Sequence, residues 1–307
     1  MVISKVYSDA RRSRRVCKKM KRLLNVLGAL VSDLTQNELA ARGACRCHKF
    51  RSGGFGMELH TYGQALWNAK NATGGNACVA VSRNWIWDPD ETLFDLPRDK
   101  SCAKHLVSWK GKHGPKGWGV DKRLRRAATT QYLMAHMNAS IYADAMKTAA
   151  YRAFTGSARR VVSVHVRWGD KGREMALRPI NEYVEAVRNV TRYSGEALDV
   201  FLTTEDAKAV AAFRKAAPEN WNVVVYEAAV SSDKVLYGRH GMADQARNHR
   251  ESGYHSLVAL VLAMQADAFV ITSGSNWSRL MEELCLGKEL EPRCAMVDVT
   301  PWRPHDW

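Results

Sequence analysis

Long hydrophobic runs are absent from the sequence. The longest candidate for a membrane segment, residues 23–31, is interrupted by Asn25 and Gly28, whereas a spanning helix needs about 20 apolar residues. The sequence therefore encodes no transmembrane helix. With 46% hydrophobic and 25% charged residues, the chain has the composition of an ordinary globular protein, which argues against disorder, collagen or coiled coil as a description of the whole. Its 307 residues suffice for one large domain or two ordinary ones.

The cysteines lack the spacing of a zinc site. None of the seven forms a C-x-x-C pair, and Cys45 with Cys47 does not have zinc-ligand spacing. We therefore expect no structural metal. Cys285 and Cys294 bracket a short segment and form a candidate disulfide loop in an oxidising compartment. Four Asn-x-Ser/Thr sequons also fit a secretory protein: Asn71, Asn138, Asn189 and Asn276. The compartment stays open at this point, and we favour the secretory pathway or the Golgi lumen.

Acidic residues are scarce relative to basic ones, but the excess is confined to two stretches. The net charge is +15, and residues 1–22 and 100–126 contribute +8 each, so the rest of the chain sums to −1. A basic tail and a basic loop with Gly and Pro are typical of solvated segments rather than of a surface that reads nucleic acid. We expect no nucleic-acid partner. The loop is a candidate for guiding an anionic substrate toward a cleft.

A regular alternation of strand and helix patterns begins after residue 155. Pro179 stands at the favoured first position of a helix. The predicted strands are 161–166, 199–204, 222–227, 268–272 and 295–299, and the predicted helices are 179–190, 206–217, 254–265 and 276–286. This alternation predicts an α/β fold with a parallel, doubly wound sheet. We divide the chain into a basic N-terminal segment (1–40), an N-terminal α/β lobe (41–155) and a Rossmann-like lobe (156–307).

Residues 41–155 show a weaker pattern. The glycines of residues 51–60 form G-x-G rather than G-x-G-x-x-G, so they fail as a dinucleotide fingerprint. A helix at 57–68, a strand at 77–82 and one long helical stretch at 129–153 are predicted. Asp88-Pro89-Asp90 has the form of a metal-binding D-x-D, but Pro between the acids is typical of a turn. We discount it as a metal site.

Polar residues follow three of the predicted strands. They are His165, Arg167, Asp170, Thr203, Glu205, Asp206, Ser273, Gly274 and Ser275. Because the carboxyl ends of parallel strands share one edge of a sheet, these residues are expected at the edge where such sheets bind ligands. The sequence TSGSN also lies between a strand and a helix, where small residues and helix amides suit an anion.

Residues 164–184 carry a recognisable signature, VHVRWGDKGREMALRPINEYV. It resembles the HVRRTDK segment, followed by a Glu and a Pro-Ile-x-Glu-Tyr helix, of the eukaryotic alpha-1,6-fucosyltransferases and their bacterial nodulation relatives (glycosyltransferase family 23). Four further segments resemble the family in the same order: CHKFRSGGFGMELH, SRNWIWDPDETLF, VFLTTED and MQADAFVITSGSNWSRL. The resemblance covers roughly residues 45–285. The family's SH3 domain and coiled stem have no counterpart in these residues.

The resemblance implies a two-lobed, GT-B-like fold with the acceptor on the N-terminal lobe. It implies an inverting, metal-independent transfer of fucose from GDP-fucose to a sugar hydroxyl of a glycan or glycoprotein, with no cofactor besides this donor substrate. Without a metal, the departing diphosphate needs fixed positive charge, which an Arg at the end of a strand supplies in bidentate form.

The family's functional residues map onto this sequence one by one. The implied catalytic residues are Arg167 at the diphosphate, Glu174 as general base, and Lys171 and Asp170 beside it. The implied donor-binding residues are His165, Arg167, Ser275, Gly274, Tyr183, Asp206, Glu205, Gly54 and Gly56. Arg167 has an alternative structural role, an ion pair with Asp170, and Asp206 has one as a helix N-cap.

The sequence departs from the family at three points. Trp168 replaces a second Arg, the segment between Lys171 and Glu174 is one residue shorter, and the region of Ala259 lacks the aspartate that reads guanine in the family. Two alternatives therefore stay open: a transferase that uses another nucleotide sugar, and a non-catalytic protein that binds a glycan or nucleotide sugar. The basic loop and the Trp-rich segment around Trp85, Trp87, Trp109 and Trp118 are candidates for an acceptor cleft, although Trp is more often core.

Overall fold

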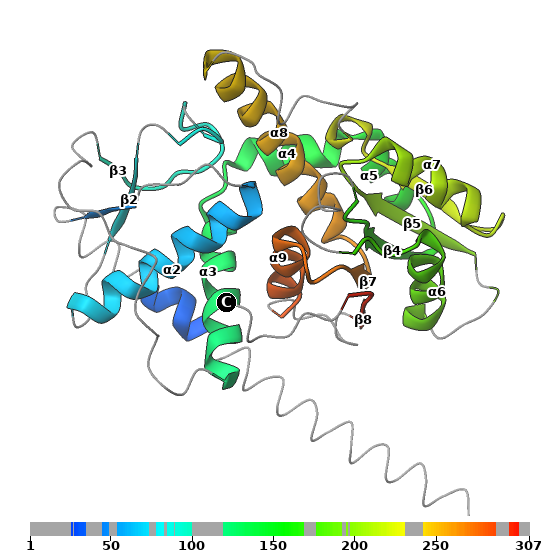
Figure 1. Ribbon diagram of the computed structural model, residues 1–307, viewed down its shortest axis with the longest axis horizontal. Coiled ribbons are helices and arrows are strands. Elements are labelled where there is room, and N and C mark those ends of the chain that lie inside the picture. The colour runs from blue at the N-terminus through cyan, green and yellow to red at the C-terminus, as the bar shows by residue number, and fades with distance from the viewer. Residues whose placement is uncertain are drawn as a thin grey trace, which may run out of the picture.

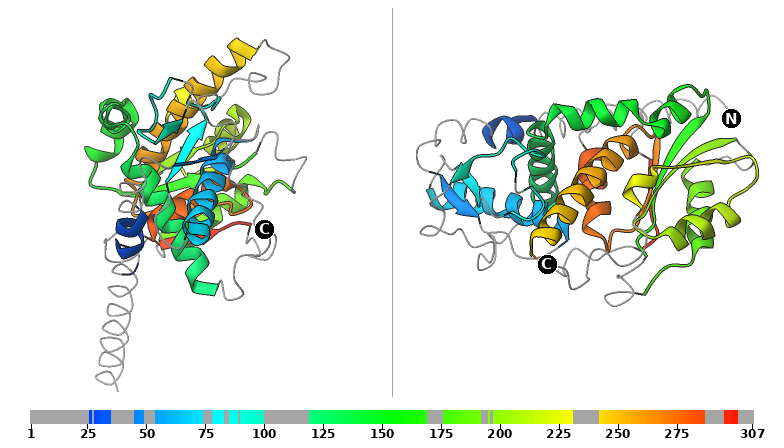
Figure 2. Two further views of the ribbon diagram at one scale, coloured as in Figure 1. Left: turned by 90° about the vertical axis from the view of Figure 1, so that its left-hand side faces the viewer. Right: turned by 90° about the horizontal axis from the view of Figure 1, so that it is seen from above.

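The computed structural model contains two parallel sheets toward opposite ends of the molecule (Figures 1 and 2). The structure describes residues 26, 28–34, 45–48, 54–73, 78–82, 85–88, 90–99, 119–168, 176–191, 195, 197–230, 242–286 and 295–300. Between the sheets lie α3 (Gly119–Ala135), α8 (Met242–Ala263) and α9 (Asn276–Cys285). The catalytic candidates Asp170, Lys171 and Glu174 lie outside the described residues.

The larger sheet has the strand order β6-β5-β4-β7-β8, and all neighbouring strands are parallel. Its strands are β4 (Arg160–His165), β5 (Leu198–Thr203), β6 (Asn222–Val225), β7 (Ala268–Ile271) and β8 (Ala295–Asp298). The chain adds strands to one side of β4 and then to the other, so the order reverses between β4 and β7. Ligands bind at such a switch point in open α/β sheets. The predicted parallel α/β sheet is confirmed.

Helices cover both faces of this sheet. Val162 and Val164 of β4 pack with α6 (Ile180–Thr191) and α7 (Ala207–Ala216) on one face. Val161 and Phe201 pack on the other face, in a cluster that includes α8 and α9. Because side chains alternate along a strand, a strand covered on both faces is apolar throughout. This explains why these strands appear in the sequence as continuous apolar runs.

The smaller sheet has the order β1-β2-β3 and is also parallel. It consists of β1 (Arg46–His48), β2 (Val79–Ser82) and β3 (Arg98–Asp99), and α2 (Phe55–Thr73) connects β1 to β2. A disulfide joins Cys45 and Cys78, the residues directly before the paired strands β1 and β2. Cys47 and Cys285 are also disulfide-bonded. The predicted partner of Cys285, Cys294, lies outside the described residues.

The single helical stretch predicted at 129–153 is wrong. The chain forms three helices there: α3, α4 (Ala139–Lys147) and α5 (Ala149–Thr155). Asn138 caps α4 by accepting from the amide of Ser140, and Thr148 caps α5 by accepting from the amide of Tyr151. Such caps satisfy amides at a helix start. Hydrophobic periodicity alone does not reveal these breaks, because the core-facing pattern continues through them.

The other predicted elements are present with shifted ends. Helix α8 begins at Met242 rather than at 254, and α2 runs from 55 to 73 rather than from 57 to 68. The short strands β1 and β3 were not predicted, and a 3₁₀ turn, η2 (Glu227–Ala229), follows β6. Strands of two or three residues are too short to carry a period-2 signal.

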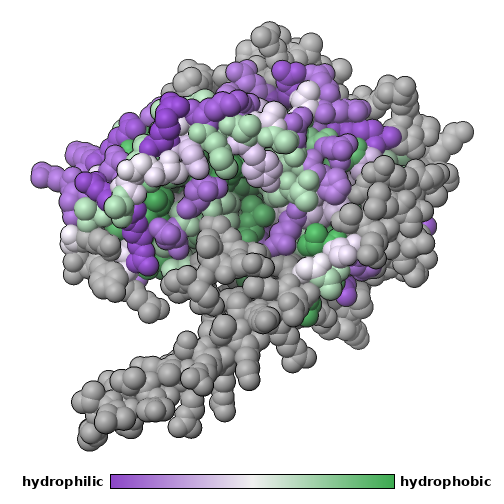
Figure 3. Space-filling model, turned by 180° about the vertical axis from the view of Figure 1, so that it is seen from behind, coloured by the Kyte–Doolittle hydropathy of each residue, from purple (hydrophilic) through white to green (hydrophobic). Residues whose placement is uncertain are grey.

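One apolar cluster joins the two sheets. It contains residues of α2, β2 and α3 together with residues of β7, α8 and α9. Few large hydrophobic side chains are exposed among the described residues (Val26, Tyr142, Met146 and Leu177). Figure 3 shows hydrophilic residues along the upper rim of one face. Within the described part of the chain, no helix has the length and apolar character needed to cross a membrane.

Replacing both Cys45 and Cys78 by alanine should lower the free energy of unfolding. The bridge spans 33 residues, and closing a loop of that size restricts the unfolded chain by about 3–4 kcal/mol. Guanidinium unfolding of the double variant and of the wild type, both under non-reducing conditions, measures the difference. Equal midpoints and slopes for the two proteins would contradict the prediction.

Candidate functional site

The candidate site lies at the carboxyl ends of β4 and β7. Strand β4 ends at His165, and β7 is followed by residues 272–275, which lead directly into α9. Ser275 caps α9, because its side chain accepts from the amide of Trp277. Ser273 is fixed by β8: its amide donates to Asp298 at 3.1 Å, and its hydroxyl donates to the carbonyl of Thr300 at 2.6 Å. The predicted small-residue turn therefore begins a helix at the switch point.

A buried network ties the end of β4 to this turn. His165 Nδ1 lies 2.6 Å from the hydroxyl of Ser278, which also accepts from the amide of Thr272 at 3.0 Å. The Thr272 hydroxyl donates to the carbonyl of His165 and lies 2.8 Å from the hydroxyl of Tyr183. The sequence placed His165 and Tyr183 at the donor. In the structure Tyr183 is fully buried, and its hydroxyl supports the turn after β7 through the contact with Thr272.

Arg167 follows β4 and is directed toward the end of β5. Its Nη1 donates to Glu205 at 3.0 Å and to the carbonyl of Trp168 at 3.2 Å. The Arg167 side chain is 13% exposed, whereas that of Glu205 is 51% exposed. Two predicted site residues from different strands thus meet. The alternative partner, Asp170, lies outside the described residues.

Asp206 has the structural role that was considered for it. Its side chain accepts from the amide of Lys208 and caps α7. This contact accounts for the residue without any ligand. Its role in donor binding remains a prediction.

The first turn of α2 packs against the first turn of α9. A Cβ on Gly56 would lie 3.2 Å from the backbone N of Trp277 and 3.3 Å from Asn276, a distance that few real side chains accept. Gly54 precedes the helix, is exposed, and would meet nothing within 4 Å. Phe55 stacks on Trp277, with ring centroids 6.0 Å apart. Two predicted glycine and serine segments, far apart in the sequence, therefore lie together.

Each helix start carries partial positive charge, because its first amides have no partner within the helix. Two such starts in contact repel one another weakly, and a bound anion would remove that repulsion. Arg167 follows the neighbouring strand β4, where its charge is paired with that of Glu205. This arrangement suits a diphosphate.

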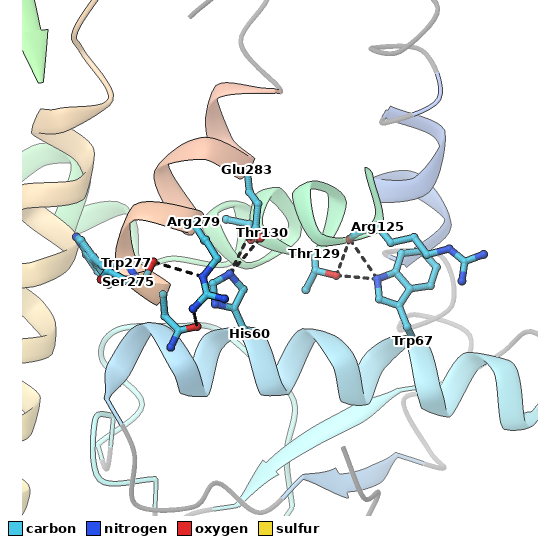
Figure 4. Close-up of polar contacts among 10 residues, drawn as sticks. His60, Trp67, Arg125, Thr129, Thr130, Ser275, Trp277, Arg279 and Glu283 are labelled. Atoms are coloured by element: carbon cyan, nitrogen blue, oxygen red, sulfur yellow. Dashed lines mark hydrogen bonds and ion pairs between the residues drawn. The ribbon is translucent and has the colours of Figure 1, made fainter. Parts of the chain in front are cut away.

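A second polar cluster, on α2, α3 and α9, was not predicted from the sequence (Figure 4). His60 Nε2 lies 3.1 and 3.0 Å from the two carboxylate oxygens of Glu283, and Thr130 donates to one of them at 2.5 Å. Arg279, also on α9, donates to Asn276 at 2.8 Å. The cluster holds α2 against α9. The His60–Glu283 pair spans 223 positions, so no local sequence signal reveals it.

Burial and charge set the protonation of these groups. Burial, together with the charge of Arg167, lowers the pKa of His165 to about 3. Burial alone would raise the pKa of Glu283, but His60, Thr130 and Arg126 outweigh it, so this pKa lies below its usual range. Burial, with Arg126 nearby, lowers the pKa of Arg279 to about 10. At neutral pH, His165 is therefore neutral and Glu283 is a carboxylate.

The Asp88-Pro89-Asp90 segment is occupied by structural contacts. Asp88 is fully buried and accepts from the amides of Thr92, Leu93 and Phe94 and from Arg98. Asp90 pairs with Arg250 of α8 at 2.5 Å. Among the described residues, no group of three or more His, Cys, Asp or Glu is arranged to hold a metal ion.

Trp85 and Trp87 belong to the core rather than to an acceptor cleft. Both are buried, and Phe55 packs against both rings. The Trp85 indole donates to Glu58 at 2.6 Å. The prediction of an acceptor surface is therefore wrong for these two residues, whereas Trp109 and Trp118 lie outside the described residues.

Several solved structures resemble this chain, and three of them are described below, whereas no family model and no curated protein matches it. The selenomethionine form of fucosyltransferase NodZ from Bradyrhizobium has 14% identity and a TM-score of 0.47, and covers 78% of this chain and 91% of its own. Fucosyltransferase NodZ from Bradyrhizobium has 14% identity and a TM-score of 0.46, with 77% and 91% covered. NodZ alpha-1,6-fucosyltransferase soaked with GDP-fucose has 14% identity and a TM-score of 0.45, with 78% and 92% covered. At these values the likeness supports no statement about activity.

Stability should fall as the pH is lowered from 7 to 5. Burial lowers the pKa of His48 to about 4 and that of His165 to about 3. Both stay neutral in the folded chain, while the unfolded chain takes up protons below its ordinary histidine pKa of about 6.5. Each therefore contributes stability that is lost as the pH falls through this window, about 1.4 kcal/mol per pH unit.

Denaturant unfolding at pH 7 and pH 5 measures this loss. The His165→Asn variant cannot titrate at that position. The part of the stability loss that comes from His48 and His165 together should therefore be about half as large in this variant as in the wild type. Identical losses in the two proteins would show that the folded state accepts a proton on His165.

Proposed function

We propose that the protein is an inverting, metal-independent glycosyltransferase that moves fucose from GDP-fucose to a sugar hydroxyl of a glycan or glycoprotein. The observation that carries the proposal is the contact between the starts of α2 and α9 directly after β7, the strand that lies beside β4, whose end Arg167 follows. The ordered sequence resemblance supports the choice of reaction.

The chemistry assigns a task to each of these features. When the sugar leaves, negative charge develops on the diphosphate, and fixed donors in a site of low polarity stabilise that charge. Arg167 would contact the diphosphate, while Ser275, Gly274 and the amides that begin α9 would hold the distal phosphate. Gly56 lets the start of α2 approach the start of α9, and Gly54 stands exposed directly before α2, where its amide would face the same phosphate. These residues supply the charge that a metal ion supplies in other transferases.

The general base in this proposal is Glu174, with Lys171 and Asp170 beside it. All three lie outside the described residues and follow Arg167 by only a few positions. A carboxylate there would take the proton of the acceptor hydroxyl as that oxygen attacks the sugar. The proposal places the base and the diphosphate contact on one segment after β4.

A different donor base remains a second candidate for one reason. Ala259 lies buried in the core of α8, at the place where the family has its guanine-reading aspartate. A buried methyl group accepts no hydrogen bond from guanine. A transferase that uses another nucleotide sugar, or a non-catalytic binder, would keep the rest of the site.

An oxidising compartment fits the disulfide chemistry. Cys45, Cys47, Cys78 and Cys285 are disulfide-bonded, and such bonds persist mainly in secreted proteins and in the secretory pathway. We propose the secretory pathway or the Golgi lumen as the location. Its glycoproteins would supply the acceptor, and no nucleic-acid partner is part of the proposal.

Replacing Arg167 by alanine should lower the transfer rate about 100- to 1,000-fold, the usual effect of losing one donor that stabilises a developing oxyanion. Arg167→Lys should recover little, because an ammonium lacks the planar fork that meets two oxygens together. A donor-to-acceptor transfer assay and a melting temperature, measured on the same sample, separate catalysis from stability.

The matched control is Arg214→Ala. Arg214 also pairs with a glutamate, Glu227, at 3.1 Å, but it lies in the last turn of α7 and its partner follows β6, the outer strand, which β5 separates from β4 and β7. This variant should keep full activity. A lower melting temperature of Arg167→Ala, with normal sugar transfer by its folded fraction, would show that the Arg167–Glu205 pair is structural. Arg167 would then not be a catalytic residue.

A further inference from the structure

We propose that Ser278 is a positioning residue that fixes His165 in the tautomer with hydrogen on Nε2, so that His165 offers a hydrogen-bond donor at the carboxyl edge of β4. The identity of the ligand that meets this donor rests on the proposed function. The choice of tautomer rests on the geometry of Ser278 alone. Ser278 lies on the first turns of α9, and His165 is the last residue of β4.

The direction of each hydrogen bond follows from the groups that can only donate. A backbone amide always donates, so the Thr272 amide uses one lone pair of the Ser278 hydroxyl at 3.0 Å. Ser278 is fully buried, so its hydroxyl hydrogen also needs an acceptor. Within the described residues, the acceptor in reach is Nδ1 of His165, at 2.6 Å. The Ser278 hydroxyl therefore donates to Nδ1.

A neutral imidazole carries one hydrogen, on one of its two nitrogens. If Nδ1 accepts from Ser278, the hydrogen is on Nε2. The opposite tautomer would give the Ser278 oxygen two donors and leave its hydroxyl hydrogen without an acceptor in a fully buried place. The doubly protonated ring has the same defect. Burial also lowers the pKa of His165 to about 3, which agrees with a neutral ring.

The second ring nitrogen is left available. The described residues offer Nε2 no hydrogen-bond partner, and the residue as a whole is 4% exposed. His165 stands beside the turn that begins α9, where the nucleotide sugar is proposed to bind. An Nε2–H at this point selects an acceptor atom on the ligand and cannot act as a base.

The backbone around the ring is fixed as well. The Thr272 hydroxyl donates to the carbonyl of His165 at 3.2 Å, and the Tyr183 hydroxyl, 2.8 Å away, donates to Thr272 in turn. His165 at the end of β4 and Ser278 in the first turn of α9 thus lie on two segments that further hydrogen bonds join. Such supporting contacts keep a donor in one direction before a ligand arrives.

The tautomer is tested first, in the protein without nucleotide. A nitrogen-15 NMR spectrum of histidine-labelled protein, assigned with a His165 variant, should show a pyrrole-type Nε2 and a pyridine-type Nδ1 for His165. Ser278→Ala should move both resonances toward an average of the two tautomers. A wild-type ring with hydrogen on Nδ1 would overturn the proposal. This wild-type spectrum needs no Ser278 variant, so the test stands even if Ser278→Ala fails to fold.

The ligand contact is tested with two changes that separate the ring nitrogens. His165→Asn keeps a polar atom near Nδ1 and removes the Nε2–H, whereas His165→Gln keeps an amide where Nε2 lies. The KM for GDP-fucose should rise about 3- to 10-fold in the Asn variant, the effect of one neutral hydrogen bond, with kcat nearly unchanged. The Gln variant should stay closer to the wild type.

The outcomes distinguish this inference from the proposed function. Equal KM values in the Asn and Gln variants would refute the contact through Nε2. An Nε2–H ring in a protein that binds neither GDP nor GDP-fucose would refute the proposed function and confirm the role of Ser278 in setting the tautomer. A KM rise in Ser278→Ala with an unchanged His165 spectrum would show that Ser278 acts through the Thr272 amide instead.

Discussion

The contact between the first turns of α2 and α9 is the constraint on which the site depends. Gly56 allows it, because any side chain there would press against the backbone of Asn276 and Trp277. The stacked rings of Phe55 and Trp277 and the His60–Glu283 pair further along the helices hold the same two helices together. The contact brings two positive helix ends to one place. Helix starts attract anions, and the contact of two of them is the physical reason to expect an anionic ligand here.

The sheet supplies the other half of the site. Its strand order places the ends of β4 and β7 side by side, and the turn after β7 begins α9. His165 and Ser278 are bonded across this junction, so the position of the helix start is tied to the position of Arg167 two residues later in the chain. The helix amides and the start of the Arg167 segment are therefore joined through one hydrogen bond, while Glu205 holds the guanidinium itself. In the proposed function, charge fixed in this way stabilises a departing diphosphate.

The sequence predicted the parts of this structure that have a local signal. The apolar runs of β4, β5 and β7 predicted a parallel sheet, and the order of strands and helices then placed His165, Arg167 and Ser275 at one edge. The breaks at Asn138 and Thr148 were missed, because they depend on individual caps. The bonds that assemble the site were also missed, since His165 and Ser278 are 113 positions apart and His60 and Glu283 are 223 apart. Periodicity holds no information about such pairs.

The central claim, that this junction binds a guanine nucleotide through its diphosphate, is tested most directly by a thermal-shift panel with GDP, UDP, ADP and CMP. A ligand that binds only the folded chain stabilises it by about 2.7 kcal/mol at a concentration 100 times its Kd. GDP should raise the melting temperature of the wild type selectively, and the rise should shrink in Arg167→Ala. An equal response to all four nucleotides, or no response to any, would contradict the claim.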